Sequence, residues 1–414
     1  MFKRVPGTKD ILPNEIISWQ WIETIARNIF SLYNYQEIRT PLIEEAGLFN
    51  RTLGESAEIV QKQMFLIHNQ EDTYALRPEG TAAIVRSYLE NNLDKTSGFI
   101  KLFYIGPMFR LERPQKGRLR QFHHIGCEVI GSPDAGLDVE VIALAEHLVK
   151  SISIENYKIK INSLGCPKDK EKLTLALKEA LQKNIKELCA DCQERVKKNV
   201  LRVLDCKNEV CQKIVHGLSL KSTHLCPECA ANFEEVKTGL KNLDIPFQVQ
   251  PYLVRGLDYY NRTVFEISHP ELGSQDAIGA GGRYNNLIQE LGGPDLGGIG
   301  FAFGVERLLL AAKNIPVNLD NNLVYLISLG SEAKSNSAKI LNSLRLNGIP
   351  SDTDYLNKSL KGAMRAANDA HAKYVLILGD DELKKNIITL KDMSSGTQRE
   401  LTLENLIKEL LSLQ

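Results

Sequence analysis

The spacing of apolar residues predicts that helices and strands alternate through most of the chain. Apolar positions at helical spacing predict a helix over 15–33, and a short strand follows at 38–43. As far as position 314, runs rich in β-branched and aromatic residues predict strands, and apolar residues at helical spacing predict helices. These are two strands joined by the turn PQKG within 99–130, strands at 247–267, 275–281 and 298–304, and helices at 134–152, 284–291 and 305–314.

The pattern changes twice along the chain. Segment 166–240 is rich in Lys and Cys and has no long apolar strand, so we interpret it as a mostly helical insertion. After the linker IPVNLDNN, the buried strands VYLISLG and YVLILG alternate with helices predicted at 332–347 and 359–370. This alternation predicts a small α/β domain with a largely parallel sheet. We therefore expect one domain over 1–321 and a second over 322–414.

Composition narrows the classes of partner. The 414 residues are 43% hydrophobic and 25% charged, and 51 basic residues balance 51 acidic ones, so a nucleic acid would have to bind local basic clusters. The N-terminus has no apolar core long enough for a signal peptide, and no run of about 18 apolar residues predicts a membrane span. We expect a cytoplasmic protein whose eight cysteines are thiols or metal ligands.

Three stretches carry polar groups inside apolar patterns. LVRGLDYYNRTVFE, 253–266, is expected to be a strand although it contains Arg255, Asp258 and Glu266, which are costly to bury without partners. In the hairpin 109–131, alternation places Arg110 and Glu112 on one strand face. On the second strand Phe122, His124 and Glu128 share a face, which suits a nucleotide, although a solvated hairpin with ordinary ion pairs fits equally well.

The third stretch is GGIGFAFGVERLLL, a Gly-rich strand that leads into a helix. Backbone without side chains can approach a ligand closely, and Arg307 in the first helical turn could hold a terminal phosphate. The alternative is a tight strand–helix junction with a surface arginine. The chain has no GxxxxGKS phosphate loop.

Taken together, these stretches resemble the bacterial-type histidyl-tRNA synthetases. IRTPLIEEAGLF, with Pro41 and Glu44, resembles motif 1 of class II aminoacyl-tRNA synthetases, 109–131 resembles motif 2, and GFAFGVERL resembles motif 3. LVRGLDYY, AGGRYNNL and LRPEGT resemble segments of the histidine enzyme. The resemblance covers nearly the whole chain. It implies an α+β catalytic domain with an antiparallel sheet flanked by helices, a mostly helical insertion and a C-terminal α/β anticodon-binding domain.

The resemblance also implies the reaction and its substrates. ATP, with Mg²⁺ bridging its phosphates, would activate L-histidine to histidyl-adenylate, and the histidine would pass to the 3′ end of tRNA(His). The matching residues imply that Arg110 and Arg255 contact the α-phosphate and Arg307 the γ-phosphate. The implied ATP site comprises Arg110, Glu112, Arg118, Phe122 and Arg307.

The implied histidine pocket comprises Glu79, Gly80, Thr81, His124, Glu128, Arg255, Tyr259, Tyr260 and Tyr284. In it Glu128 and Tyr260 would serve the imidazole ring, and Glu79 and Thr81 the α-amino group. His124 stands where the family has Gln, so an imidazole replaces the amide there. Further departures from the family pattern are Asn285, Asn286 and Pro6.

The cysteines raise the question of a structural zinc ion. CADC and CPEC place Cys189, Cys192, Cys226 and Cys229 as two CxxC pairs, with Cys206 and Cys211 between them. Two CxxC pairs are typical of a tetrathiolate zinc site when the gap is about 15–20 residues, and this gap is longer. Free thiols are the alternative.

On the tRNA side, the resemblance places Arg113, Gln115 and Lys116 at the acceptor end, and motif 1 implies a homodimer. The C-terminal domain would read the anticodon, with phosphate contacts from Lys358, Lys361, Arg365, Lys384 and Lys385 unless these simply form a solvated face. Other interpretations are a histidine-binding regulatory subunit of ATP phosphoribosyltransferase, a proline or threonine synthetase, and a pure binding module. The intact LVRGLDYY and the C-terminal domain disfavour the regulatory subunit.

Overall fold

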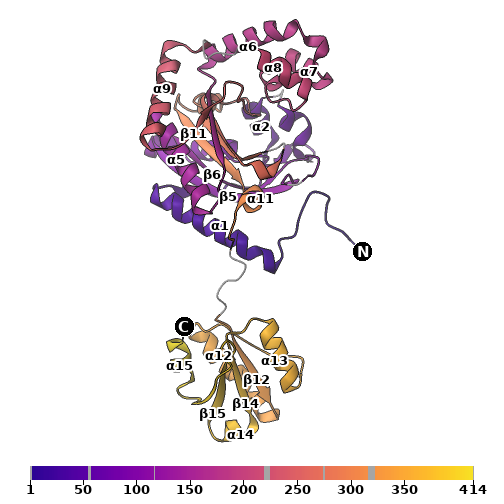
Figure 1. The fold of residues 1–414 in the computed structure, drawn as a ribbon, viewed down its shortest axis with the longest axis vertical. Coiled ribbons are helices and arrows are strands. Elements are labelled where there is room, and N and C mark those ends of the chain that lie inside the picture. Colours follow the sequence, from indigo (N-terminus) through magenta and orange to yellow (C-terminus); the bar gives the residue numbers. More distant parts are fainter. Residues whose placement is uncertain are drawn as a thin grey trace. The chain divides into compact units, whose positions relative to one another are not determined.

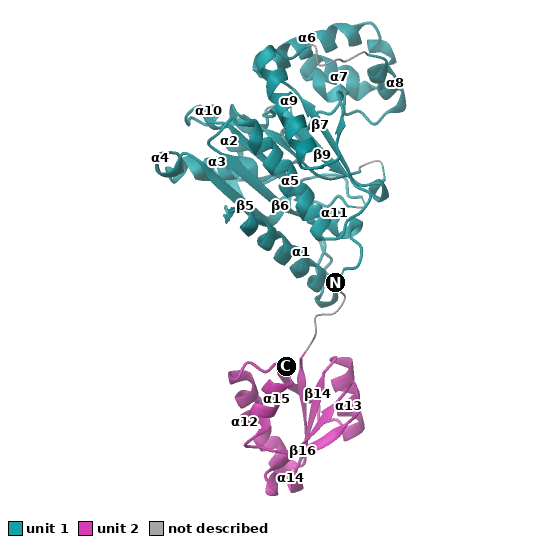
Figure 2. Cartoon of the chain, turned by 60° about the vertical axis from the view of Figure 1, so that its left-hand side comes forward, with its two compact units in different colours: residues 1–316 teal, residues 317–414 magenta. Residues whose placement is uncertain are grey.

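The chain folds into two compact units, Met1–Pro316 and Val317–Gln414 (Figure 2). The computed structural model describes residues 2–413 except 55–56, 116, 219–223, 274–275 and 316–321. The boundary between the units falls within the stretch that the sequence marks as a linker. Among the described residues, no helix combines the length and the apolar character that crossing a bilayer requires.

An eight-stranded sheet forms the centre of the first unit (Figure 1). Its order is β1-β5-β6-β11-β10-β9-β7-β8; the inner neighbours are antiparallel, and the edge pairs β1/β5 and β7/β8 are parallel. The strands are β1 (Gln36–Glu37), β5 (Ile100–Phe109), β6 (Gln121–Ile130), β7 (Lys158–Ser163), β8 (Gln248–Val249), β9 (Asn261–Ser268), β10 (Ala277–Arg283) and β11 (Gly298–Gly304). The expected antiparallel sheet is thus confirmed, with one parallel strand added at each edge.

Helices pack one face of this sheet into the larger core. On α1, Trp19, Ile22 and Ala26 repeat at helical spacing and point into it. The last helix of segment 166–240 also contributes to this core, through Phe233 and Val236. The helices of this layer are α1 (Pro13–Leu32), α5 (Ala135–Ser151), α9 (Pro227–Asn242) and α11 (Val305–Ala311).

A second core lies under the shorter helices and the insertion. It includes the aromatic rings of Tyr259, Tyr260 and Tyr284 together with apolar side chains of the insertion. The helices are α2 (Ala46–Leu53), α3 (Thr81–Glu90), α4 (Leu93–Ser97), α6 (Pro167–Gln182), α7 (Ala190–Lys198), α8 (Glu209–Gly217) and α10 (Leu287–Glu290), with short turns of helix at Ile59–Gln63, Ile185–Glu187 and Val200–Val203. A further short turn, Pro270–Leu272, packs against the first core through Leu272. A small sheet, β2-β4-β3, was not predicted; it comprises β2 (Ile43–Glu45), β3 (Phe65–His68) and β4 (Thr73–Leu76).

The second unit is a five-stranded sheet in the order β13-β12-β14-β15-β16. Only β12 pairs in parallel, with β13 and β14, so the expectation of a largely parallel sheet is half right. The antiparallel strands β15 and β16 were not predicted. The elements are β12 (Val324–Leu329), α12 (Ser331–Leu346), β13 (Ser351–Thr353), α13 (Leu360–Asp369), β14 (Tyr374–Gly379), α14 (Asp380–Lys384), β15 (Ile387–Asp392), β16 (Gln398–Thr402) and α15 (Leu406–Ser412).

The strand expected over 247–267 is wrong in its middle, because residues 250–260 form a loop between β8 and β9. Side chains of the insertion bind the carbonyl groups of this loop. Lys170 Nζ donates to the carbonyls of Asp258 and Tyr260 at 2.6 and 3.1 Å, and Arg202 donates to that of Gly256 at 2.8 Å. These bonds replace the partners that a neighbouring strand would supply.

Candidate active site

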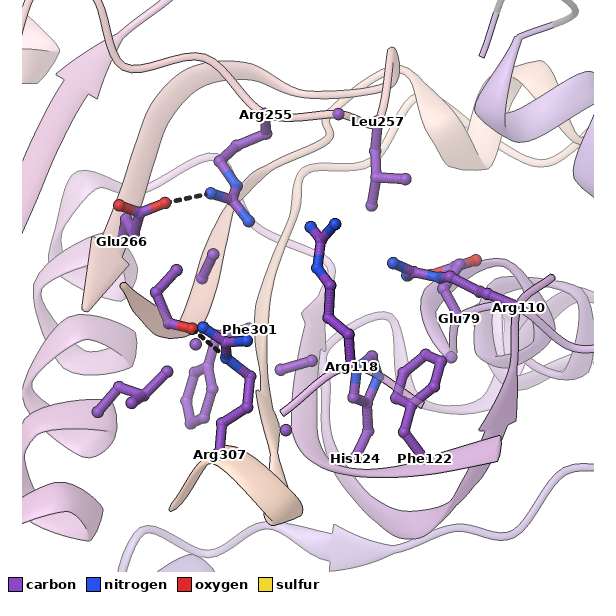
Figure 3. A pocket seen from close by; sticks show the side chains of 18 of the residues that line it. Glu79, Arg110, Arg118, Phe122, His124, Arg255, Leu257, Glu266, Phe301 and Arg307 are labelled. Carbon is purple, nitrogen blue, oxygen red and sulfur yellow. Dashed lines mark hydrogen bonds and ion pairs between the residues drawn. The ribbon is translucent and has the colours of Figure 1, made fainter. Parts of the chain in front are cut away.

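A cavity of about 310 Å³ opens over the inner strands of the large sheet (Figure 3). The sheet supplies its floor, and the first turns of α3 and α11 and the loop before β9 supply its walls. Most of the residues expected in the ATP and histidine sites line it, namely Glu79, Gly80, Thr81, Arg110, Glu112, Arg118, Phe122, His124, Arg255, Tyr259, Tyr260 and Arg307. The structure therefore gathers side chains from four separate sequence segments into one cavity.

Four guanidinium groups reach the cavity from different sides (Figure 3). Arg255 Nη1 donates to Glu266 Oε2 at 2.6 Å, so these two residues of the stretch 253–266 form an ion pair. Arg307 Nε donates to the carbonyl of Ala277 at 2.6 Å, and Arg110 Nε donates to that of Pro78 at 2.9 Å. These bonds fix the guanidinium groups in place, and Arg110 and Arg255 keep other N–H groups for a ligand. Burial lowers the pKa of Arg110 and Arg307, yet an arginine stays charged in proteins.

The motif 2 residues form an aromatic and charged wall. The Arg110 guanidinium lies over the Phe122 ring at 5.3 Å, and Glu112 lies 3.3 Å from Arg118. The sequence placed Arg110 and Glu112 on a strand face, which is wrong because β5 ends at Phe109. Both residues lie in the segment beyond the strand, and both still line the cavity, whereas Leu111 between them does not.

Beside Arg110, a buried carboxylate sits at the start of α3 (Figure 3). Glu79 accepts hydrogen bonds from the backbone N–H groups of Thr81 and Ala82 at 2.7 and 2.8 Å. Both donors belong to the unpaired first turn of a helix, so the carboxylate is held where the helix dipole favours it. Burial nevertheless raises the pKa of Glu79.

Glu128 lies directly behind the cavity wall. Its Oε1 accepts from Thr81 Oγ1 at 2.6 Å and its Oε2 from the Tyr284 hydroxyl at 2.5 Å. Burial raises the pKa of Glu128 to about 8, against the opposing effect of these two hydrogen bonds. Gly300 leaves the room that this carboxylate occupies, since a Cβ there would stand 2.0 Å from Glu128 Oε2. Glu128 and Tyr284 thus form a buried layer beneath the expected histidine site.

His124, the departure from the family pattern, is half-buried and packs against Phe122 with ring centroids 5.1 Å apart. Burial, aided by the charge of Arg110, lowers the pKa of His124 to about 3, so the ring is neutral at physiological pH. Its Nδ1 has no hydrogen-bond partner among the described residues. A neutral imidazole offers one donor and one acceptor, as an amide side chain does, although on separate atoms.

Some expected residues lie elsewhere, and some lining residues were not expected. Arg113 and Gln115 do not line the cavity, and Lys116 lies outside the described residues. No local motif pointed to Tyr104, Asp205, Lys207 or Asp276, which all line the cavity. Asp276 and Glu266 share Lys160 Nζ at 3.0 and 3.3 Å. Strand pairing between distant segments brings these groups together.

The expected zinc site of Cys189, Cys192, Cys226 and Cys229 does not form as one cluster. The first CxxC pair lies with Cys206 and Cys211, whereas the second lies with Cys166 and Asp169. The physical reason is that the pairs begin two different helices, α7 and α9, on separate parts of the insertion.

Comparison with known proteins agrees with this geometry. A family model described as histidyl-tRNA synthetase matches residues 7–308, and one described as anticodon binding domain matches 323–413. A protein of Halothermothrix orenii named histidine–tRNA ligase is 46% identical over 412 residues, covering 98% of both chains. One of Bacillus cytotoxicus with the same name is 46% identical and covers 96% of both chains.

The crystal structure of apo histidyl-tRNA synthetase from S. aureus superposes with a TM-score of 0.82 at 36% identity, covering 99% of this chain and 100% of that one. A Bacillus halodurans structure titled as an ATP phosphoribosyltransferase regulatory subunit/histidyl-tRNA synthetase has a TM-score of 0.66 at 22% identity and shows a shared fold alone. The catalytic unit has the class II aminoacyl-tRNA synthetase fold. Within that class, the chain belongs to the histidyl-tRNA synthetase family.

Proposed function

We propose that this protein is a histidine–tRNA ligase that works through histidyl-adenylate. One structural observation supports the proposal beyond the family match. A single cavity is lined by arginines that suit phosphates, and beneath it lie buried polar groups that suit an imidazole. ATP enters as its Mg²⁺ complex, and the carboxylates of Glu112 and Asp276 in the cavity wall would offer the oxygen ligands that Mg²⁺ prefers. The proposed place of action is the cytoplasm, where tRNA is charged.

In the first step, a carboxylate oxygen of histidine attacks the α-phosphorus of ATP, and the bond to pyrophosphate breaks. Two anions must approach each other while negative charge grows at phosphorus, so fixed cations lower the barrier. We assign Arg110 and Arg255 to the α-phosphate and Arg307 to the γ-phosphate, and all three line the cavity. In the second step, a hydroxyl of the terminal adenosine of tRNA attacks the carbonyl carbon, and AMP leaves.

Histidine selection follows from the polarity of the buried layer. We assign the imidazole ring to Glu128 and Tyr260, and the α-amino group to Glu79 and Thr81. A pocket whose polar groups lose their partners with an apolar substrate can discriminate by about 10⁴-fold or more without editing. The Tyr259 ring packs against Tyr260 and Tyr284, at 4.7 and 5.8 Å between centroids, and so holds the lining in place.

ATP–pyrophosphate exchange without tRNA tests the assignment. Exchange is expected with histidine and not with proline or threonine, because those two cannot satisfy Glu128. Histidine binding without exchange would instead indicate a regulatory subunit, and exchange with proline or threonine would indicate a different synthetase.

The turn of the motif 2 hairpin is proposed to meet the tRNA acceptor end. Replacing Gln115 and Lys116 together by Ala is expected to lower aminoacylation about tenfold while leaving exchange within about twofold, because charged and amide groups there would contact phosphate and sugar. Exchange and single-turnover aminoacylation, measured on the same preparation, separate the two steps. Equal loss in both would place the turn in the chemistry of activation instead.

The remaining partner assignments rest on resemblance and surface character. Leu42, Ile43, Leu66 and Ile67, in and beside the small sheet, are 41–50% exposed, which gives a second copy of the chain an apolar surface to cover in the proposed homodimer. Lys358, Lys361, Arg365, Lys384 and Lys385 are all exposed on the second unit. They remain our candidates for anticodon-stem phosphate contacts.

A further inference from the structure

We propose that the helical insertion holds two separate zinc ions, one on Cys189, Cys192, Cys206 and Cys211 and the other on Cys166, Asp169, Cys226 and Cys229. In each set, one potential ligand atom per residue lies within 4.8 Å of all the others. Seven of the eight cysteines belong to these sets, and the eighth, Cys127, lies on β6 of the large sheet.

The first set has the dimensions of a tetrathiolate ion site. Sulfur atoms about 2.3 Å from a tetrahedral zinc ion stand about 3.8 Å apart. Cys189 Sγ and Cys206 Sγ are 3.9 Å apart, far longer than a disulfide of about 2.05 Å. Sulfur atoms this close leave room for one ion and not for a polynuclear cluster.

Backbone N–H groups also point at the sulfur atoms of the first set. The N–H of Cys189 donates to Cys211 Sγ at 3.3 Å, and that of Asn208 donates to Cys206 Sγ at 3.4 Å. Such donors stabilise the thiolate form that binds a metal ion. The ligands come from the start of α7, the turn after the helical turn Val200–Val203, and the start of α8, so an ion would tie three short elements together.

The second set joins two helix starts built in the same way. Cys166–Pro–Lys–Asp169 begins α6 and Cys226–Pro–Glu–Cys229 begins α9, with cysteine at the N-cap and proline at the first helical position in both. The positive ends of both helix dipoles therefore favour anionic ligands at this point. A zinc ion here would clamp helices that lie about 60 residues apart in the sequence.

The carboxylate of Asp169 independently indicates a ligand. It is fully buried, and its Oδ2 accepts from the N–H of Cys226 at 3.0 Å. Its Oδ1 has no hydrogen-bond partner among the described residues, and Lys172 Nζ stands 3.9 Å away on a largely exposed side chain. Burying a carboxylate oxygen among three thiols costs free energy unless a cation binds that oxygen.

The choice of zinc follows from the ligand set. Thiolates with at most one carboxylate, in a compact four-atom arrangement, suit a tetrahedral ion without redox chemistry. None of the proposed ligands lines the substrate cavity, so the ions would be structural. The two neighbours of Cys206, Asp205 and Lys207, do line it. The first ion would thus position one edge of that cavity.

Metal analysis of the full-length protein tests the proposal. Protein purified under reducing conditions without chelator is expected to carry two zinc ions per chain. Cys206→Ala and Cys226→Ala should each carry one, and the double variant none. Cys127→Ala, the matched control, should keep both. Asp169→Cys should keep both ions and Asp169→Ala only one.

Independent of any variant, X-ray absorption at the zinc edge of the unaltered protein should show sulfur ligands at about 2.3 Å with a minor oxygen component. Four results would overturn the proposal: no stoichiometric metal, disulfides in place of metal, iron in place of zinc, or one and the same ion lost from both single variants. The last result would restore a single shared site.

Discussion

Arg255→Ala is expected to lower kcat/KM for histidine-dependent pyrophosphate exchange by about 10²–10³-fold, the usual effect of removing one fixed donor from a developing anion. The side chain lines the cavity, and Glu266 holds one of its nitrogens at 2.6 Å. The remaining N–H groups are free to meet two anions at once. Arg255→Lys keeps the charge without the fork and should recover only part of the rate.

Glu266→Gln separates a catalytic role from a structural one. If Arg255 mattered only as the partner of Glu266, losing either side chain would have the same effect. We expect Glu266→Gln to cost about tenfold, because the guanidinium keeps its charge and loses only its orientation. Thermal unfolding of each variant checks that the fold survives. Exchange in Arg255→Ala within threefold of the unaltered enzyme would contradict the assigned role.

Glu128→Gln is expected to raise KM for histidine about 100-fold and to change its dependence on pH. Burial raises the pKa of Glu128 to about 8, whereas the pKa of a free histidine ring is about 6.5. Between these values, the free carboxyl carries one proton and the free ring none, which is the single proton that their hydrogen-bonded pair needs. Below about pH 6.5 the free carboxyl and the free ring carry two protons in total, so binding must release one. Above about pH 8 they carry none, so binding must take one up.

The affinity for histidine should therefore be greatest between about pH 6.5 and 8 and should fall on both sides. The alkaline fall belongs to Glu128 and should disappear in Glu128→Gln, because an amide does not titrate. Glu79 faces the same cavity with its own raised pKa, so Glu79→Gln serves as the comparison. An alkaline limb that persists in Glu128→Gln and disappears in Glu79→Gln would move the ring contact to Glu79.

Local pattern predicted those parts of the molecule whose partners are close in sequence. Strand β11 runs over 298–304 as expected, and α1 and α12 begin and end within two residues of their expected bounds. Residues Glu79, Arg110 and Arg307 were found because each lies in a short motif of its own, and all three line the cavity.

The failures come from interactions between distant segments. The loop before β9 looks like a strand by composition, yet Lys170 and Arg202 bind its carbonyls from the insertion. Likewise, the two CxxC pairs were grouped by their spacing, whereas Cys166 and Asp169, 60 positions before the second pair, share its cluster. Tyr104 and Asp205 carried no motif, since only the folded chain brings them to the cavity.

The hydrogen bonds between the insertion and the loop before β9 also affect local unfolding. Lys170, Asn199 and Arg202 bind three backbone carbonyls and the side chain of Asp258, so the loop cannot open until these bonds break. The insertion and the loop that carries Arg255 then form one cooperative unit whose opening free energy is shared. A substitution that weakens the insertion would leave a folded protein that still unfolds on heating. Its loop before β9 would be open for a larger fraction of the time, and in that state the protein could not bind its substrates.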